Sequence, residues 1–202
     1  MGIRSTEMIP LNLPNLITLL RILAIPVVIV ALLEETPHGD ALAAIAFALA
    51  AASDGLDGYI ARSRDSVTNF GKLMDPLADK LLITAALIAL VSLGRLPAWV
   101  AMVIIAREFT VTALRLIAAE RGVVIAASWM GKVKTVLQIA AVFGLILFVP
   151  APTAVWILVY AALVVTVVSG LDYVFGLRRR FEEQRRLDRT RDGRRADDGP
   201  AA

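Results

Sequence analysis

The stretch SDGLDGYIARSRDSVTNFGKLMDPLADK, from Ser53 to Lys80, lies between long runs of Ala, Leu, Ile and Val and contains two pairs of aspartates. The pairs are Asp54 with Asp57 and Asp75 with Asp79. Residues three or four apart share one face of a helix, so we predict two helices joined by a short polar turn, each presenting a pair of carboxylates. Ionised carboxylates are costly in apolar surroundings unless cations neutralise them. Four of them facing one cleft therefore predict a divalent-metal site.

The ligand chemistry of this stretch indicates the kind of metal. Carboxylate oxygens are hard ligands that suit Mg²⁺ or Mn²⁺, which in proteins usually combine a few carboxylates with substrate phosphates. Four carboxylates can hold two ions, and a pair of metal ions serves phosphoryl transfer by stabilising the attacking and leaving oxygens. Three glycines in the same stretch allow the backbone to approach a bulky phosphate group: Gly55, Gly58 and Gly71. We predict a two-ion magnesium or manganese centre for phosphate chemistry.

The composition predicts an all-α integral membrane protein. Of the 202 residues, 58% are hydrophobic, and the mean hydropathy is +0.72. A spanning helix needs about 20 mostly apolar residues. Six blocks reach or nearly reach that length: about 13–33, 41–62, 74–93, 97–118, 132–149 and 152–176. We predict six transmembrane helices forming one catalytic domain over residues 1–176, followed by a charged and partly disordered cytoplasmic tail over residues 177–202.

Charge differs between alternate connections of the predicted spans. The first connection, Glu34–Asp40, has three acids and no Lys or Arg. Basic residues lie on the other side: Arg4, Arg62, Arg64, Lys72, Arg121, Lys132, Lys134 and the tail from Arg178. Because cytoplasmic loops carry an excess of Lys and Arg, both termini and the loops after the second and fourth spans are predicted to be cytoplasmic. The expected protein is a multi-pass cell-membrane protein, N-in and C-in, whose active site faces the cytoplasm.

Other function classes are disfavoured by the sequence. The chain has no cysteine, which excludes disulfides and cysteine-based metal sites, and its one histidine, His38, is expected in a solvated loop. The tail from Arg178 has nine Arg among 25 residues and fits a solvated stop-transfer segment or an arm that touches anionic lipid headgroups. Nucleic-acid binding is not expected, because no folded domain or aromatic platform surrounds these basic residues.

The aspartate stretch resembles the signature of the CDP-alcohol phosphatidyltransferase family, D-x2-D-G-x2-A-R-x8-G-x3-D-x3-D, in full from Asp54 to Asp79. The resemblance implies six transmembrane helices in a homodimer, embedded in membrane lipids, that transfers a phosphatidyl group from a CDP-linked lipid to an alcohol. It also implies that Asp54, Asp57 and Asp75 hold divalent metal around the pyrophosphate. Asp79 is implied to be the base that deprotonates the alcohol, with a further contact to metal.

The resemblance extends to the run LPNLITLLR, Leu13–Arg21, which is similar to the first helix of that family. Together with the aspartate stretch, it implies a set of residues lining the pocket for the cytidine and pyrophosphate of CDP-diacylglycerol. These residues are Asn15, Thr18, Arg21, Gly58, Arg62, Thr68 and Gly71.

Four basic residues in the second half predict an anionic acceptor alcohol. Arg107 lies about ten residues, or about 15 Å, into the fourth span, and Arg115 lies two turns further. Lys132 and Lys134 open the fifth span. Converging on the acidic site, these cations favour a phosphorylated alcohol. Two other interpretations stay open: plain membrane anchoring for the lysines, and an ion pair with an acid of a neighbouring helix for Arg107. Glu108 is expected to offset only part of that charge, since adjacent helical residues point about 100° apart.

Two further runs, IAREFTVTALR (Ile105–Arg115) and SWMGKVKTVLQ (Ser128–Gln138), resemble those of the phosphatidylglycerophosphate synthases within the family. This implies that CDP-diacylglycerol and sn-glycerol 3-phosphate give phosphatidylglycerophosphate and CMP. Alternatives within the fold use inositol phosphate or phosphatidylglycerol as acceptor. A divalent-cation transporter, from a different class, is disfavoured because the four acids lie near one membrane face and no broken-helix pair is visible at the midplane.

Overall fold

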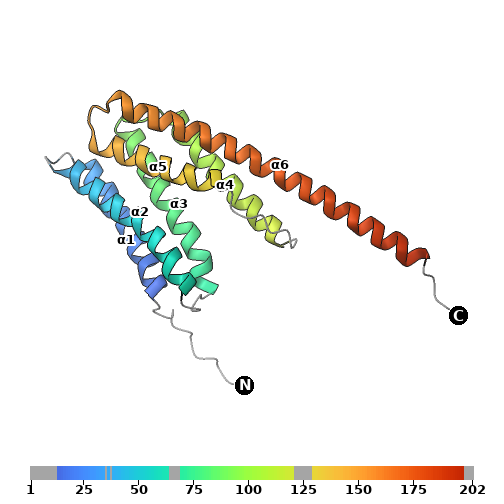
Figure 1. Ribbon diagram of the computed structural model, residues 1–202. Helices are drawn as coiled ribbons and strands as arrows, with labels where there is room; N and C mark the ends of the chain where they lie inside the picture. The colour runs from blue at the N-terminus through green and yellow to red at the C-terminus, as the bar shows by residue number, and fades with distance from the viewer. Residues whose placement is uncertain (1–12, 35, 37, 64–68, 121–128, 198–202) are drawn as a thin grey trace, which may run out of the picture.

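A computed structural model of the chain describes residues 13–34, 36, 38–63, 69–120 and 129–197, with side chains described for 19–34, 36, 38–53, 80–120 and 129–182. The described residues form six helices (Figure 1): α1 (Leu13–Leu33), α2 (Gly39–Ser63), α3 (Asn69–Ser92), α4 (Ala98–Glu120), α5 (Trp129–Leu147) and α6 (Thr153–Asp197). Each of the first five predicted apolar blocks coincides with one helix to within about five residues, and the sixth forms the first part of α6, so the all-α prediction is confirmed. The helix α6 continues without a break through residues 177–197 of the predicted tail.

Helix length and composition suit a membrane. Helices α1 to α5 contain 19 to 25 residues, or about 28–38 Å at 1.5 Å per residue, close to the hydrocarbon thickness of a bilayer of about 30 Å. Within the described residues, α5 and the α6 segment Thr153–Glu182 are each long and apolar enough to cross a membrane. Three shorter segments are also apolar: Leu19–Leu33, Gly39–Ser53 and Lys80–Ser92. The number of spans therefore stays a prediction.

The outward surface of the bundle is apolar. Large hydrophobic side chains are more than half exposed on every helix from α1 to α6, among them Leu20, Leu49, Ile88, Met102, Val136 and Ile157. A soluble monomer rarely exposes apolar side chains on this scale, whereas lipid tails accommodate them without cost. The surface and the helices together indicate a membrane protein.

Small residues allow the helices to pack closely. Helix α1 packs against α2 and α3, and α5 packs against α6. Contacts of α2 and α3 with α5 join these two groups, and α4 packs against α6 and α3. Ala43, Ala44 and Ala86 are fully buried in the core around Phe47 and Leu90. Because alanine brings helix backbones close together, these positions hold the three N-terminal helices in one tight layer.

The connection between α3 and α4 anchors one end of the bundle. Gly94 has φ +67°, and the amides of Gly94 and Arg95 donate to the carbonyls of Val91 and Leu90, which is the pattern of a glycine-terminated helix. Arg95 then donates from its two terminal nitrogens to Asp40 at 2.7 and 3.1 Å and to the carbonyl of Ile146 at 3.4 Å. The bidentate pair joins the start of α2 to the residues after α3, and the bond to Ile146 adds the end of α5.

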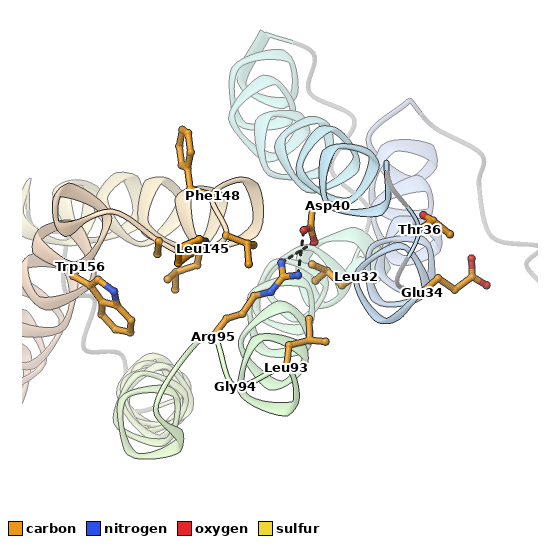
Figure 2. A pocket seen from close by; sticks show the side chains of 13 residues that line it. Leu32, Glu34, Thr36, Asp40, Leu93, Gly94, Arg95, Leu145, Phe148 and Trp156 are labelled. Atoms are coloured by element: carbon orange, nitrogen blue, oxygen red, sulfur yellow. Dashed lines mark hydrogen bonds and ion pairs between the residues drawn. The ribbon is translucent and has the colours of Figure 1, made fainter.

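The same end contains an open cavity of about 770 Å³, whose walls include Asp40, Arg95, Phe148 and Trp156 (Figure 2). The two charged side chains Arg95 and Asp40 in its wall neutralise each other in the ion pair described above. The cavity lies at the opposite end of α2 and α3 from the aspartate stretch, because it is lined by the beginning of α2 and the residues after α3. His38 is exposed at this end, in agreement with the sequence prediction.

Candidate functional site

The backbone of α2 and α3 places the four aspartates at matching depths. Asp57 lies six residues before the end of α2, and Asp75 lies six residues after the start of α3. Asp54 and Asp79 lie about one turn deeper in the same two helices, which are in contact. The two helices predicted for the stretch are therefore confirmed, while the predicted turn between them falls on residues 64–68, which lie outside the described residues. The side chains of residues 54–79 lie outside those described, so their metal and base roles stay predictions.

The donor set fits a hard divalent cation, because it offers carboxylates from two neighbouring helices at common levels. Among the side chains that the structure describes, no group of three or more His, Cys, Asp or Glu residues could hold a metal ion.

The other residues predicted for CDP-diacylglycerol follow the same elements. Asn15 and Thr18 lie in the first two turns of α1, Gly58 and Arg62 near the end of α2, and Gly71 in the first turn of α3. Thr68 lies outside the described residues. That these residues line a nucleotide pocket stays a prediction.

Arg21 joins α1 to the residues directly before the first aspartate pair. Its side chain is 2% exposed. Its Nε donates to the carbonyl of Ala50 at 3.3 Å and to Ser53 Oγ at 3.4 Å, and its Nη2 donates to the same hydroxyl at 3.4 Å. Since Ser53 precedes Asp54, the guanidinium lies close to the start of the acidic stretch. A buried arginine there supplies positive charge from inside the protein.

A second cavity, of about 600 Å³, lies between α3, α4, α5 and α6. The structure brings all four predicted acceptor cations to it, from two helices. Among the described residues, its charged lining consists of six basic and two acidic side chains: Lys80, Arg107, Arg115, Lys132, Lys134, Arg180, Glu108 and Asp172. The excess of positive charge makes the cavity suitable for an anion. Lys80 directly follows Asp79 in the chain, so the part of α3 that carries the second aspartate pair leads directly to a residue of this cavity.

The innermost part of this cavity is an ionic cluster around Glu108. Its Oε1 accepts hydrogen bonds from Lys134 Nζ at 2.6 Å and from Arg107 Nη1 at 2.9 Å. The three side chains are only 9–15% exposed. The long side chain of Arg107 reaches around the helix to Glu108, and one carboxylate shared by two cations is consistent with the prediction that Glu108 offsets only part of the charge of Arg107. Arg107 is thus part of an internal ion pair, but its acid, Glu108, lies on the same helix, whereas the interpretation named an acid of a neighbouring helix.

Arg107 is also fixed by α6. Its Nε donates to the carbonyl of Thr166 at 3.0 Å, and its Nη2 donates to Ser169 Oγ at 2.8 Å. Gly170 makes this close approach possible, because a Cβ there would stand 3.1 Å from Arg107 Cγ and 3.2 Å from Nε. One glycine in α6 thus provides the space that the arginine side chain occupies.

The outer part of the cavity contains the more exposed cations. Arg115 lies over the ring of Tyr173 at 5.6 Å from its centroid, within range of a cation–π interaction. Lys132 is exposed at the start of α5. The helix α6 supplies Ser169, Asp172 and Arg180 to the wall, although its sequence carried no functional prediction. Ser169 and Asp172, about one turn apart in the apolar part of α6, are the signal that could have identified this face.

The chain is similar to known enzymes of one family. The family model for CDP-alcohol phosphatidyltransferase matches residues 11–168. The CDP-diacylglycerol–glycerol-3-phosphate 3-phosphatidyltransferase of Bacillus subtilis is 46% identical over 183 residues, covering 80% of this chain and 93% of that protein. A probable phosphatidylglycerophosphate synthase of Mycobacterium tuberculosis is 45% identical over 168 residues, covering 81% and 80%. A Rickettsia bellii protein with the same name as the Bacillus enzyme is 36% identical over 176 residues, covering 84% and 97%.

Proposed function

The chain belongs to the CDP-alcohol phosphatidyltransferase family, and we propose that it transfers the phosphatidyl group of CDP-diacylglycerol to sn-glycerol 3-phosphate. The products are phosphatidylglycerophosphate and CMP. Relatives that are 36–46% identical carry this activity in their names, and they cover most of this chain. The enzyme is a phosphatidyltransferase of phospholipid biosynthesis.

The observation that carries the choice of acceptor is the basic cavity beside the second aspartate pair. Its wall brings together Arg107, Arg115, Lys132 and Lys134, and it also includes Lys80, the residue that follows Asp79. An acceptor that carries its own phosphate can bind these cations while its hydroxyl extends toward the aspartates. Serine and other alcohols without phosphate offer no dianion to neutralise this charge.

In this proposal the four aspartates act at the pyrophosphate of CDP-diacylglycerol. Asp54, Asp57, Asp75 and Asp79 would hold Mg²⁺ or Mn²⁺, two ions in all, which supply charge neutralisation at the pyrophosphate when bound. Asp79 accepts the proton of the C1 hydroxyl as that oxygen attacks the β-phosphorus of CDP-diacylglycerol. The bond from this phosphorus to the bridging oxygen breaks, and CMP leaves with the electron pair. A positioned general base typically contributes about 10²- to 10⁴-fold in rate.

A second set of residues, most of them in α1 and α2, is proposed to bind the other substrate, CDP-diacylglycerol. The proposed contacts to cytidine and pyrophosphate are Asn15, Thr18, Arg21, Gly58, Arg62, Thr68 and Gly71. The Arg21 bonds to Ala50 and Ser53 support a role in fixing the helix segment that precedes Asp54. Once CMP forms, Arg62 is the proposed partner for its new negative charge.

The proposed topology has six spans with both termini and the active site at the cytoplasmic face, in a homodimer. Exposed tryptophans support two membrane boundaries, since Trp99 lies at the start of α4 at one end of the bundle and Trp129 lies at the start of α5 at the other end.

Because the sequence contains no cysteine, single introduced cysteines can test the orientation directly. A membrane-impermeant maleimide applied to intact cells should label a His38→Cys variant and leave a Lys132→Cys variant unlabelled until the cells are opened. Labelling of Lys132→Cys in intact cells contradicts the orientation.

The activity itself is tested with purified protein in detergent, CDP-diacylglycerol and Mg²⁺ or Mn²⁺, by measuring CMP release. Separate reactions contain sn-glycerol 3-phosphate, inositol phosphate or phosphatidylglycerol as acceptor. We expect release with glycerol 3-phosphate and loss of release with a chelator. Faster release with inositol phosphate or phosphatidylglycerol contradicts the acceptor assignment. Absence of CMP release with every alcohol contradicts the enzyme assignment and favours a cation transporter.

A further inference from the structure

We propose that Glu108 is a positioning residue that holds Lys134 and Arg107 in the arrangement that binds the phosphate of the acceptor. This inference rests on the proposed function and adds to it a residue outside the proposed substrate contacts. Glu108 would act through its two basic partners, without touching the acceptor.

The first step of the argument is that one carboxylate oxygen orders two cations. Lys134 Nζ and Arg107 Nη1 both donate to Glu108 Oε1, so the two positive groups are neighbours. Two like charges at that separation repel each other and would move apart into the cavity without the shared acid. With Glu108 in place, the pair keeps a net positive charge in a fixed position.

The second step concerns the donors that remain. An ammonium has three N–H groups and a guanidinium has five. Lys134 uses one on Glu108, and Arg107 uses one from each of its three nitrogens, on Thr166, Glu108 and Ser169. Each terminal nitrogen of Arg107 therefore keeps one N–H beyond these three bonds. These N–H groups can donate charge-assisted hydrogen bonds to phosphate oxygens.

The third step is the position of the cluster. Glu108, Arg107 and Lys134 all line the basic cavity, and Lys80 lines it beside Asp79. A phosphate bound at the cluster thus shares one cavity with the helix segment that carries the proposed base.

The test compares Glu108→Gln, Glu108→Asp and the control Asp40→Asn, which weakens the Arg95–Asp40 pair at the opposite end of the bundle. The measurements are the dissociation constant of sn-glycerol 3-phosphate by titration calorimetry, the KM of each substrate and the melting temperature in detergent. We expect Glu108→Gln to weaken acceptor binding and raise the acceptor KM about 10-fold, while the KM of CDP-diacylglycerol stays within about twofold, since loss of one charge-assisted contact is of this size. Glu108→Asp should recover part of the loss.

The control separates positioning from general stability. Asp40→Asn should lower the melting temperature and leave the binding of glycerol 3-phosphate unchanged. If Glu108→Gln behaves like Asp40→Asn, or shifts both KM values equally, the positioning role is wrong. Should Glu108→Gln fail to fold, Ser169→Ala removes one anchor of Arg107 and must still weaken acceptor binding. Because calorimetry does not need turnover, wild-type protein that binds glycerol 3-phosphate without releasing CMP contradicts the proposed function alone, and wild-type protein that does not bind it contradicts the inference.

Discussion

Replacing Gly170 with alanine should weaken acceptor binding without disabling the rest of the enzyme. The added methyl would stand 3.1 Å from Arg107 Cγ and 3.2 Å from Nε, which is closer than ordinary packing. The arginine must shift by a few tenths of an ångström, and the bonds that it makes to Thr166 and Ser169 at 3.0 and 2.8 Å would lengthen. The guanidinium then loses its fixed plane.

The magnitude follows from two opposing contributions to stability. Overpacking by a methyl group costs about 1–3 kcal/mol, while alanine is favoured over glycine inside a helix by about 1 kcal/mol. The free energy of unfolding should therefore fall by only about 0–2 kcal/mol. The effect on function is more specific, because a displaced Arg107 forfeits a charge-assisted contact of about 1.5–3 kcal/mol to the phosphate, or roughly 10- to 100-fold in acceptor KM.

Gly144→Ala is a matched control on the neighbouring helix. A Cβ at Gly144 would stand 3.0 and 3.1 Å from the two methyl groups of Val155. Gly144→Ala therefore crowds the packing of α5 against α6 about as much as Gly170→Ala crowds Arg107, but it displaces no charged group. The assay is CMP release over a range of glycerol 3-phosphate concentrations, followed by thermal unfolding of each variant. Equal acceptor KM values for Gly170→Ala and Gly144→Ala would refute the reasoning, since the effect would then come from helix packing alone.

Three further predictions concern the two substrate sites. Asp57→Ala should abolish CMP release while the melting temperature in detergent is largely retained, and full activity of this variant excludes the metal assignment. Asp79→Asn should bind CDP-diacylglycerol like wild type yet turn over at least ~100-fold more slowly, the usual scale for losing a general base, and an equal fall in lipid affinity would make this residue mainly a metal ligand. Arg115→Ala or Lys134→Ala should raise the acceptor KM about 10- to 100-fold in saturation curves; a shift in the KM of CDP-diacylglycerol would assign these cations to the pyrophosphate.

The helices and the choice of charged residues could be predicted from sequence because both depend on local pattern. The apolar blocks were long enough to locate all six helices, and spacings of three and four residues defined the aspartate faces. The four cations of α4 and α5 were expected to meet because their helices are adjacent in the chain, and they do line one cavity.

The contacts that depend on tertiary packing were not predictable in the same way. The reach of Arg107 to Glu108 depends on the side-chain conformation that α6 imposes through Thr166 and Ser169. Helix α6 is distant in sequence from α4, and its polar residues are spread among apolar ones. The role of Gly170 could not be predicted from the sequence either, because it depends on Arg107, the side chain that packs against this glycine in the folded protein.

The position of α3 explains how an acidic site and a basic site can operate side by side. Asp79 and Lys80 are consecutive, and Lys80 lines the cavity that holds the acceptor cations. A phosphorylated acceptor approaching four bare carboxylates would be repelled, but the excess of basic side chains in the cavity offsets that repulsion along its path. If this balance controls binding, added salt should weaken the binding of glycerol 3-phosphate more than that of CDP-diacylglycerol, whose acyl chains bind through apolar contacts. Calorimetric titrations of each substrate at low and high ionic strength measure the difference, and equal salt dependence for both would contradict the balance.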